Sequence, residues 1–424
     1  MSTIKRIWAR EILDSRGIPT IENYCQTDDG KISVSSVPAG TSTGTHEAVE
    51  LRDMDEKRYL GQGVLKAVEN INNVLGPAVV GMDPMKQAEI DQKLISTDGT
   101  ENKSKYGANA ILAISEVVCK MGSQVSQKPL YSWIDDLGVT VGLKQGVRLP
   151  TPLLNMINGG KHGAGNLDFQ EFWVIPAIHK TFKEGLQIGA EVYQTIGKNL
   201  AQRGAIHSVG HEGGYAPNLF TNAEAFEVFV ESIKQTGHAL GRDLFLGLDV
   251  AADSFYKDGE YHIRDRTSSM SDDQLLEFYK QLNNQYKLQI IEDAFFEDAW
   301  GSWQKLTAEM SSTTIIAGDD LLATNPKRLK KAISEKACNA AIIKPNQIGS
   351  ITETLQVIKI ARDAGWKIIV SHRSGETNDS FIADFAVGVA AEYAKFGAPA
   401  RGERVAKYNR LSTIELEVEY LKNK

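Results

Sequence analysis

Residues 314–320 read Thr-Ile-Ile-Ala-Gly-Asp-Asp, a short apolar run that ends in two acidic residues. The second half of the chain repeats this form at intervals of 25 to 43 residues, which is the length of a βα unit with insertions. The apolar runs and the charged residues that follow them are 244–248 with Asp249, 288–291 with Glu292, 314–317 with Asp319 and Asp320, 340–343 with Lys344, and 367–370 with His372 and Arg373.

These runs show little alternation between apolar and polar residues, which is typical of strands that are buried on both faces of a parallel sheet. A barrel of parallel strands carries its active site at the C-terminal ends of the strands. The pattern therefore predicts a C-terminal TIM-like (β/α) barrel over residues 141–424, with the charged residues gathered at one rim.

The first part of the chain has a different organisation. Residues 4–37 read as strands, and 21–26 and 32–37 flank Asp28-Asp29-Gly30, a hairpin turn signal. Helical patterns follow at 64–75 and 108–121. Strands followed by helices predict a smaller N-terminal α+β domain over residues 1–140, so the whole chain belongs to the α/β class with two domains.

Composition excludes some classes of protein. The 424 residues carry a net charge of −7, and the isoelectric point is about 5.7, which argues against general binding to nucleic acid or to a membrane surface. Three cysteines lie far apart in the chain, in no metal-ligand spacing. The first residues lack the apolar core of a signal peptide, and no run of about 18 apolar residues is present. We expect a cytoplasmic protein.

Three carboxylates at successive strand ends, those of Asp249, Glu292 and Asp319, predict a metal site. Hard oxygen ligands that converge on one rim suit Mg²⁺. Any one of them alone could be a solvated loop acid or a helix cap. Lys344 at the same rim could lose its proton easily beside cations and act as a base. The alternative is a salt bridge to an acid such as Asp320, and the two interpretations are compatible.

Other segments indicate anion binding and close backbone packing. His372, Arg373, Ser374 and Gly375 precede a helical run, an arrangement that suits a phosphate but also occurs in ordinary capping. Glu212 lies among glycines at 210–214, and glycines allow the backbone to approach a ligand closely. The segments 158–162 and 170–171 are grouped with it as candidate loops of the site. The histidines without such context are interpreted as surface or core residues: His46, His179, His207, His238 and His262.

Several stretches together resemble the enolase family, and the resemblance covers nearly the whole chain. The matching segments are AREILDSRG at 9–17, DGTENKSK at 98–105, LD at 248–249, GDDL at 318–321, KPNQIG at 344–349 and SHRSGET at 371–377. The resemblance implies an α+β lid domain followed by a barrel, and a homodimer or a larger even assembly. It also implies a small phosphorylated hydroxy-acid as substrate. Neither nucleic acid nor a membrane is expected as a partner, because of the net charge given above.

The resemblance implies two Mg²⁺ ions per active site. Asp249, Glu292 and Asp319 would hold the first. Ser42, in the loop of small residues at 39–45, would help to bind the second once the substrate phosphate is present. The metal ions would stabilise the charge that develops when a proton leaves the carbon beside an ionised carboxylate, and closure of the loop would keep water out.

The resemblance also implies a role for each side chain that would contact the substrate. Lys344 would take the C2 proton, and Glu212, supported by Glu171, would protonate the departing C3 hydroxyl. The remaining substrate-binding residues are Lys395 at the carboxylate, Arg373 and Ser374 at the phosphate, His162 and His372 closing over the substrate, and Gln170. The implied reaction interconverts 2-phosphoglycerate and phosphoenolpyruvate.

Five positions beside these residues differ from the usual family pattern: Ala39, His211, Ala294, Phe396 and Gly402. Because His211 replaces an acid, we expect Glu212 to ionise more easily. Phe396 in place of threonine is expected to reshape the carboxylate end of the pocket. These departures leave open a paralogue that dehydrates a phosphonate or a related phospho-hydroxy-acid. A third possibility is a binding or scaffold protein without turnover.

Overall fold

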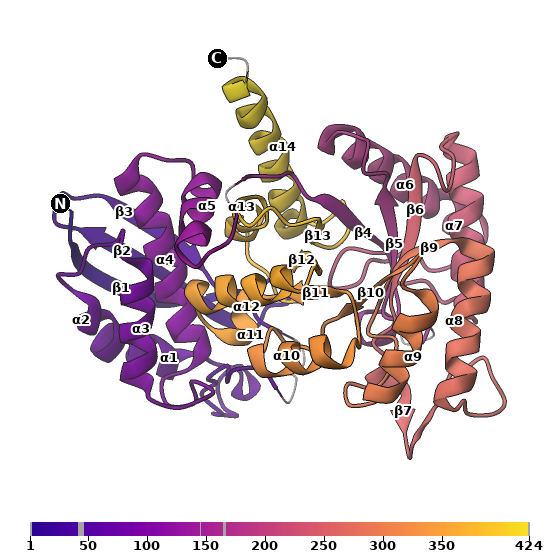
Figure 1. Cartoon of the computed structure of the whole chain (residues 1–424), viewed down its shortest axis with the longest axis horizontal. Helices are drawn as coiled ribbons and strands as arrows, with labels where there is room; N and C mark the ends of the chain where they lie inside the picture. Colours follow the sequence, from indigo (N-terminus) through magenta and orange to yellow (C-terminus); the bar gives the residue numbers. More distant parts are fainter. Residues whose placement is uncertain (1, 41–45, 145, 164–166, 423–424) are drawn as a thin grey trace.

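The computed structural model of the protein describes residues 2–40, 46–144, 146–163 and 167–422. The chain forms an N-terminal unit of one small sheet and several helices, which lies beside a closed barrel (Figure 1). Among the described residues, no helix combines the length and the apolar character that crossing a membrane requires. The predicted fold class, a barrel preceded by a smaller α+β unit, is confirmed.

The N-terminal sheet is antiparallel and has the strand order β1 (Ile4–Leu13), β2 (Pro19–Thr27) and β3 (Ile32–Ser36). The predicted hairpin joins β2 to β3, and Gly30 in its turn has a φ of +87°, which favours glycine. The buried helix α4 (Ala108–Ser126) packs against β2 and β3 and covers one face of the sheet. Because successive side chains of a strand point to opposite faces, the side chains on the face that α4 covers form the core of this unit.

The other helices of this unit are short. The pattern at 64–75 forms an α-helical turn followed by a π-helical one, and Gly76-Pro77 comes next; Pro77 has no N–H to donate to the preceding turn. The helical segments are Tyr59–Gly61 (3₁₀), α1 (Leu65–Asn70), Ile71–Leu75 (π), α2 (Gly76–Val79), α3 (Gln87–Asp98) and α5 (Leu130–Thr140). The domain division at residue 140 stays a prediction.

The barrel closes in the order β10-β11-β12-β13-β4-β5-β6-β9. All five predicted apolar runs form strands in it: β6 (Leu244–Asp249), β9 (Leu288–Glu292), β10 (Ile315–Gly318), β11 (Ala340–Ile343) and β12 (Lys367–Ser371). Three further strands complete it: β4 (Thr151–Asn158), β5 (Glu171–Pro176) and β13 (Tyr393–Lys395). Branched and aromatic side chains, including Trp173 and Ile342, fill its interior.

One strand departs from the predicted parallel barrel. β5 runs antiparallel to both neighbours, β4 and β6. Its first residue, Glu171, pairs with Asn158 at the end of β4 and with Asp249 at the end of β6. The reversal therefore brings the start of β5 to the rim where the other strands end, and it adds a carboxylate there.

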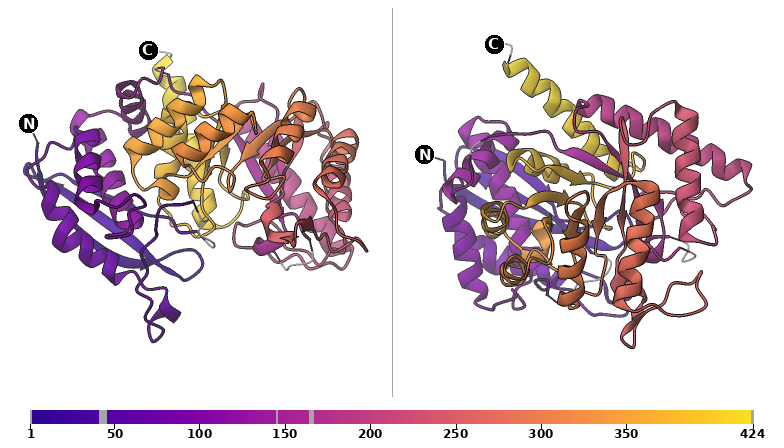
Figure 2. Two further views of the ribbon diagram at one scale, coloured as in Figure 1. Left: turned by 60° about the horizontal axis from the view of Figure 1, so that its bottom comes forward. Right: turned by 45° about the vertical axis from the view of Figure 1, so that its right-hand side comes forward.

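Helices surround the barrel, as the two rotated views show (Figure 2). The capping boxes of Thr181 with Glu184 and of Ser271 with Gln274 fix where two of them begin. The helices are α6 (Phe182–Gln202), α7 (Asn222–Thr236), α8 (Asp272–Tyr286), α9 (Trp300–Met310), α10 (Pro326–Glu335), α11 (Pro345–Ile348), α12 (Ile351–Asp363), α13 (Phe381–Gly388) and α14 (Gly402–Lys422). A small hairpin, β7 (Tyr256–Lys257) and β8 (Glu260–Tyr261), lies outside the barrel.

Candidate active site

A cavity opens at the rim where β6, β10, β11 and β12 end. Most of the predicted site residues line it, although they come from widely separated parts of the chain. The lining residues are Glu47, Lys161, His162, Gln170, Glu171, Glu212, Asp249, Ala251, Asp253, Ser254, Asp293, Asp319, Asp320, Lys344, Gln347, Ser371, His372, Arg373, Ser374 and Lys395. Ser42 lies outside the described residues.

Lys395 is the cation at the centre of the carboxylates. Its Nζ lies 2.9 Å from Asp249 Oδ2, 2.8 Å from Glu292 Oε1 and 3.3 Å from Glu171 Oε1. Burial alone would lower its pKa, but these carboxylates, Asp249 first, hold the pKa well above its usual value. Lys395 therefore remains charged and can face an anionic group of a ligand.

Two carboxylate oxygens beside Lys395 have no hydrogen-bond partner among the described residues. They are Asp249 Oδ1 and Glu292 Oε2, and both are buried. Burial and the charge of Asp249 raise the pKa of Glu292 well above its usual value. Buried acceptors without partners are costly and rare in proteins. Their chemistry, hard oxygens close together, fits a divalent cation.

The third predicted ligand, Asp319, lies against Lys344. Its Oδ2 accepts a short hydrogen bond from Lys344 Nζ, and its Oδ1 accepts one of 3.1 Å from Gln347 Nε2. Burial by itself would raise the pKa of Asp319, but the Lys344 ammonium lowers it. The salt bridge that the sequence suggested for Lys344 thus exists, with Asp319 rather than Asp320 as the partner.

The expected ease of deprotonation of Lys344 beside cations stays a prediction, and the structure adds a carboxylate contact that acts in the opposite direction. Burial alone would lower its pKa, but the Asp319 carboxylate beside the ammonium raises the pKa above its ordinary value. The neighbouring Asp320 has a pKa raised to about 7, by burial and then by the charge of Asp319. The sequence analysis considered both nearby cations and an acid partner such as Asp320, but it did not identify Asp319 as the carboxylate in contact.

Asp293 joins the two groups of acids, a role that the sequence did not suggest. Ligand atoms of Asp249, Glu292 and Asp293 lie within 4.8 Å of one another, and so do those of Asp293, Asp319 and Asp320. Among the residues that the structure describes, the predicted trio of Asp249, Glu292 and Asp319 does not itself form such a group. Asp293 Oδ1 and Oδ2 accept hydrogen bonds of 2.9 Å from the backbone N–H groups of Asp319 and Asp320, so Asp293 holds the end of β10 in place.

Glu171, Glu212 and His162 form a second cluster across the cavity. His162 Nδ1 lies 3.6 Å from Glu171 Oε1 and 3.5 Å from Glu212 Oε1. Burial opposes the charged imidazole, yet Glu212 and Glu171 raise the pKa of His162. Burial and the charge of Glu212 raise the pKa of Glu171. Burial alone would do the same to Glu212, but His162 holds its pKa well below the usual value.

His372 closes this cluster as a neutral residue. Burial lowers its pKa to about 3, although Glu212 opposes that effect. Its Nδ1 accepts a 2.7 Å hydrogen bond from Arg404 Nη1, so its Nε2 carries the hydrogen and faces Glu212 Oε2 at 3.4 Å. Arg404 is fully buried and also donates to the carbonyls of Arg373, Ser374 and His211. Arg404 therefore joins the backbone of residues 373–374 to the backbone just before Glu212.

Arg373 and Ser374, the residues predicted to bind the phosphate, line the same cavity. Arg373 is buried, and its guanidinium contacts Glu47 and Asn346. Burial opposes the charge of Arg373, but Glu47 raises the pKa of the guanidinium. Ser374 Oγ accepts a 3.2 Å hydrogen bond from Arg16 Nη1. Gln170 Nε2 donates to Asp249 Oδ2 at 3.1 Å, so it orients one carboxylate of the acidic group.

The two departures expected to change the chemistry lie outside the cavity. His211 is exposed, and the largest effect that lowers the pKa of Glu212 comes from His162. The pKa of Glu212 is lowered, with His162 as the main cause, and the effect of the missing acid at position 211 stays a prediction. Phe396 is fully buried in the core, where its ring centroid lies 6.1 Å from that of Tyr408. Phe396 is not among the residues that line the described cavity, and its expected effect on the carboxylate end stays a prediction.

The other three departures are accommodated by the backbone. Ala39 is buried and pairs with Gly375 through two backbone hydrogen bonds of 2.8 and 3.0 Å. The Ala294 carbonyl accepts a hydrogen bond from Tyr279. A Cβ at Gly402, the first residue of α14, would meet only open space. None of the three lines the described cavity.

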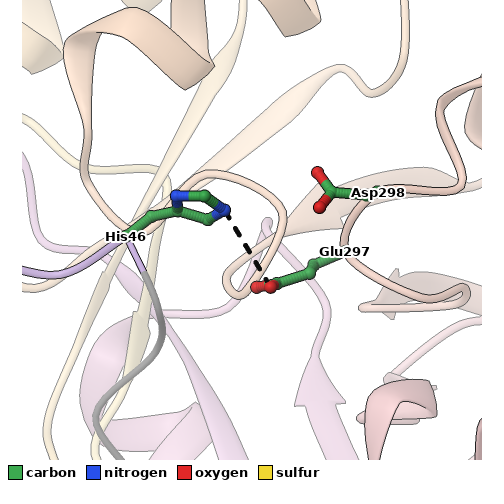
Figure 3. Close-up of side chains that lie close together, drawn as sticks. All are labelled: His46, Glu297 and Asp298. Atoms are coloured by element: carbon green, nitrogen blue, oxygen red, sulfur yellow. Dashed lines mark ion pairs between the residues drawn. The ribbon is translucent and has the colours of Figure 1, made fainter.

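His46, one of the histidines to which the sequence analysis assigned no role in the site, lies in a cluster of charged side chains. His46 Nε2 lies 3.9 Å from Glu297 Oε1, with Asp298 alongside (Figure 3). Arg328 Nη1 donates to His46 Nε2 at 2.7 Å and to Asp298 Oδ1 at 3.0 Å. The guanidinium thus supplies the positive charge of this cluster, and His46 fastens the N-terminal unit to the barrel.

Comparison with known protein families agrees with the fold. The enolase C-terminal TIM barrel domain matches residues 146–422. The enolase N-terminal domain matches residues 4–134. Together the two matches span almost the whole chain, and the first alone covers more than half of it. The chain belongs to the enolase family and is a lyase of the enolase superfamily.

Proposed function

We propose that the protein interconverts 2-phosphoglycerate and phosphoenolpyruvate, with two Mg²⁺ ions in each active site. The observation that carries the proposal is the pair of buried carboxylate oxygens of Asp249 and Glu292 that have no hydrogen-bond partner among the described residues. Both carboxylates contact Lys395, which lines the same cavity as Lys344. They provide hard ligands beside a basic side chain, which is what removal of a proton next to a carboxylate requires.

Asp249, Glu292 and Asp319 would hold the first metal ion, and Ser42 would contribute to the second. Bound Mg²⁺ supplies electrostatic stabilisation to the substrate carboxylate as negative charge develops on it. Asp293 supports this set by holding the backbone of Asp319. Lys395 adds a fixed positive charge at the same end of the cavity.

Lys344 would take the C2 proton on its Nζ. Its contact with Asp319 orients the ammonium toward the cavity but also stabilises the protonated form. When Asp319 serves a cation instead, Lys344 loses part of this stabilisation, and its pKa moves toward the range that a base needs. The raised pKa of the lysine is therefore compatible with the proposed role.

Glu212 would give a proton to the departing C3 hydroxyl. Its own pKa is low, so it needs a source of the proton, and Glu171 has a raised pKa. His162 lies within 3.6 Å of both carboxylates and can pass a proton between them. Neutral His372 directs its N–H toward Glu212 and orients the carboxyl group.

Arg373 and Ser374 would bind the phosphate. Arginine presents several N–H groups in one plane and suits a phosphate group. The side chains that differ from the usual pattern lie outside the described cavity, so they lend little support to a phosphonate or other analogue as the substrate. We further propose a homodimer or larger even assembly, as the resemblance implies, and a cytoplasmic location, as the sequence pattern indicates.

The test compares substrates directly. We expect kcat/KM for 2-phosphoglycerate to exceed that for its phosphonate analogue in the same Mg²⁺ buffer. Preference for the analogue would assign the protein to the paralogue. A folded protein that turns over neither compound would favour the binding or scaffold alternative.

A further inference from the structure

The arginine that we assign to the phosphate is already held by a carboxylate of the N-terminal unit. Glu47 Oε2 lies 2.9 Å from Arg373 Nη1, and Glu47 Oε1 lies 3.2 Å from Arg373 Nη2. The exposed fraction of each side chain is only 6%. Two parallel bonds of this kind are the geometry in which arginine also binds phosphate. Glu47 thus presents an anion to Arg373 inside the cavity.

The backbone around Glu47 is fixed to the barrel on both sides. The His46 carbonyl accepts a 3.2 Å hydrogen bond from Asn325 Nδ2, and the Ala48 N–H donates a 2.8 Å bond to the Gln347 carbonyl. The His46 side chain is held by Arg328, as described above. Glu47 therefore reaches Arg373 from a defined position on the rim.

We propose that Glu47 determines which anions bind to Arg373, because a ligand must displace the Glu47 carboxylate to reach the guanidinium. The inference rests on the proposed function, in which Arg373 binds the substrate phosphate. A phosphate dianion carries more charge than a carboxylate and has three acceptor oxygens, so it competes well. A singly charged anion competes poorly. Glu47 thereby selects phosphorylated hydroxy-acids over their unphosphorylated counterparts.

A structural role for Glu47 predicts the opposite sign. If Glu47 merely held Arg373 in place, its loss would leave the guanidinium less well oriented, and anion binding would weaken. If Glu47 competes with the ligand, its loss makes the guanidinium available, and anion binding becomes tighter. The sign of the change in affinity therefore distinguishes competition from positioning.

The experiment measures binding of inorganic phosphate and of acetate to the full-length protein by calorimetry, at one fixed Mg²⁺ concentration. We expect Glu47→Gln to bind phosphate about tenfold more tightly than the wild type, and to show a larger relative gain for acetate, since close charge pairs couple by more than about 1.4 kcal/mol. Glu50→Gln is the matched control. It removes the same charge from the same segment, but the Glu50 carboxylate pairs with Arg52, so phosphate affinity should change little.

Arg373→Gln separates failure of this inference from failure of the proposed function. If Arg373→Gln binds phosphate as well as the wild type, the phosphate assignment itself is wrong. If Arg373→Gln weakens binding while Glu47→Gln weakens it too or leaves it unchanged, only the role of Glu47 is refuted. Should Glu47→Gln prove unfolded by thermal denaturation, Glu47→Asp provides the same test. Its shorter carboxylate cannot keep both contacts, so it should bind phosphate more tightly than the wild type.

Discussion

At the scale of single residues, the two histidines beside Glu212 are expected to titrate in opposite directions. His162 gains charge stabilisation from Glu212 and Glu171 against the cost of burial, and its pKa is raised. His372 is buried beside Arg404, and its pKa is lowered to about 3. The same carboxylate therefore lies beside one imidazole whose pKa is raised and one whose pKa is lowered.

We predict that NMR titration will show His162 losing its proton above about pH 6.5, the ordinary histidine value, while His372 stays neutral down to pH 5. His162→Gln and His372→Gln assign the two signals. By linkage, His162 stabilises the fold below the pKa of the unfolded state, and this contribution is lost as pH rises through its folded pKa. His372 does the reverse, since the unfolded chain binds the proton first, so stability falls as pH drops below 6.5. Similar pKa values for both rings would contradict the site electrostatics.

The assignment of base and acid predicts a separation between two mutants. Lys344→Ala should slow exchange of the C2 proton of 2-phosphoglycerate with solvent by about 100-fold or more, because it removes the group that takes that proton. Glu212→Gln should slow loss of the hydroxyl but leave C2 exchange much less affected, since it acts on another bond. Isotope exchange in deuterated buffer measures the first step, and phosphoenolpyruvate formation measures the whole reaction. Equal exchange defects in the two mutants would show that the division of roles is wrong.

The unusual residues Phe396 and His211 should affect stability and not selectivity. Phe396→Thr removes a fully buried ring and should lower the free energy of unfolding in urea by about 3 kcal/mol. His211→Asp changes an exposed side chain and should alter kcat/KM for 2-phosphoglycerate by less than about threefold. A large gain in kcat/KM from His211→Asp would restore the view that these positions tune the chemistry.

At the scale of elements, the apolar runs and their charged ends predicted most of the barrel, because buried parallel strands have a plain apolar pattern. The antiparallel course of β5 was not predicted. Its residues 171–176 are all buried, and a buried antiparallel strand has the same composition as a buried parallel one. The direction of a strand depends on the path of the chain before and after it, and no local sequence pattern indicates that path. Asp293 was overlooked for a related reason, since its hydrogen bonds join the ends of two strands.

Asp293 provides the prediction at this scale. In Asp293→Asn one carboxylate oxygen becomes an NH₂ group, which cannot accept from the backbone N–H of Asp319 or Asp320. We expect a loss of about 1–3 kcal/mol in the free energy of unfolding, as for a buried donor left without its partner, together with weaker Mg²⁺ binding in calorimetry. Asp298→Asn, in the same loop but only in a partly exposed pair with Arg328, is the control and should cost less than about 1 kcal/mol. Equal losses in the two variants would contradict the role of Asp293.

At the scale of the whole molecule, the site depends on two units meeting at one rim. Glu47 and Arg373 are 326 residues apart in the chain, yet their side chains form a buried pair. The side chains of His46 and Arg328 make a second contact between the two units. The sequence predicted both units and the nature of the rim residues, but not which residues of the first unit reach the second. Such contacts depend on how the units pack, and the spacing of residues along the sequence does not encode them.

The most direct test of the central claim is formation of phosphoenolpyruvate from 2-phosphoglycerate by the purified protein, with Mg²⁺ and with the metal removed by a chelator. We predict turnover with Mg²⁺, loss of turnover on chelation and its return when Mg²⁺ is added back. Glu292→Gln, which changes one of the two carboxylates with an unpartnered oxygen, should stay folded and lose both Mg²⁺ binding and turnover. The claim would be contradicted by a folded wild-type protein that forms no phosphoenolpyruvate with Mg²⁺, or by a Glu292→Gln variant that retains near-normal turnover.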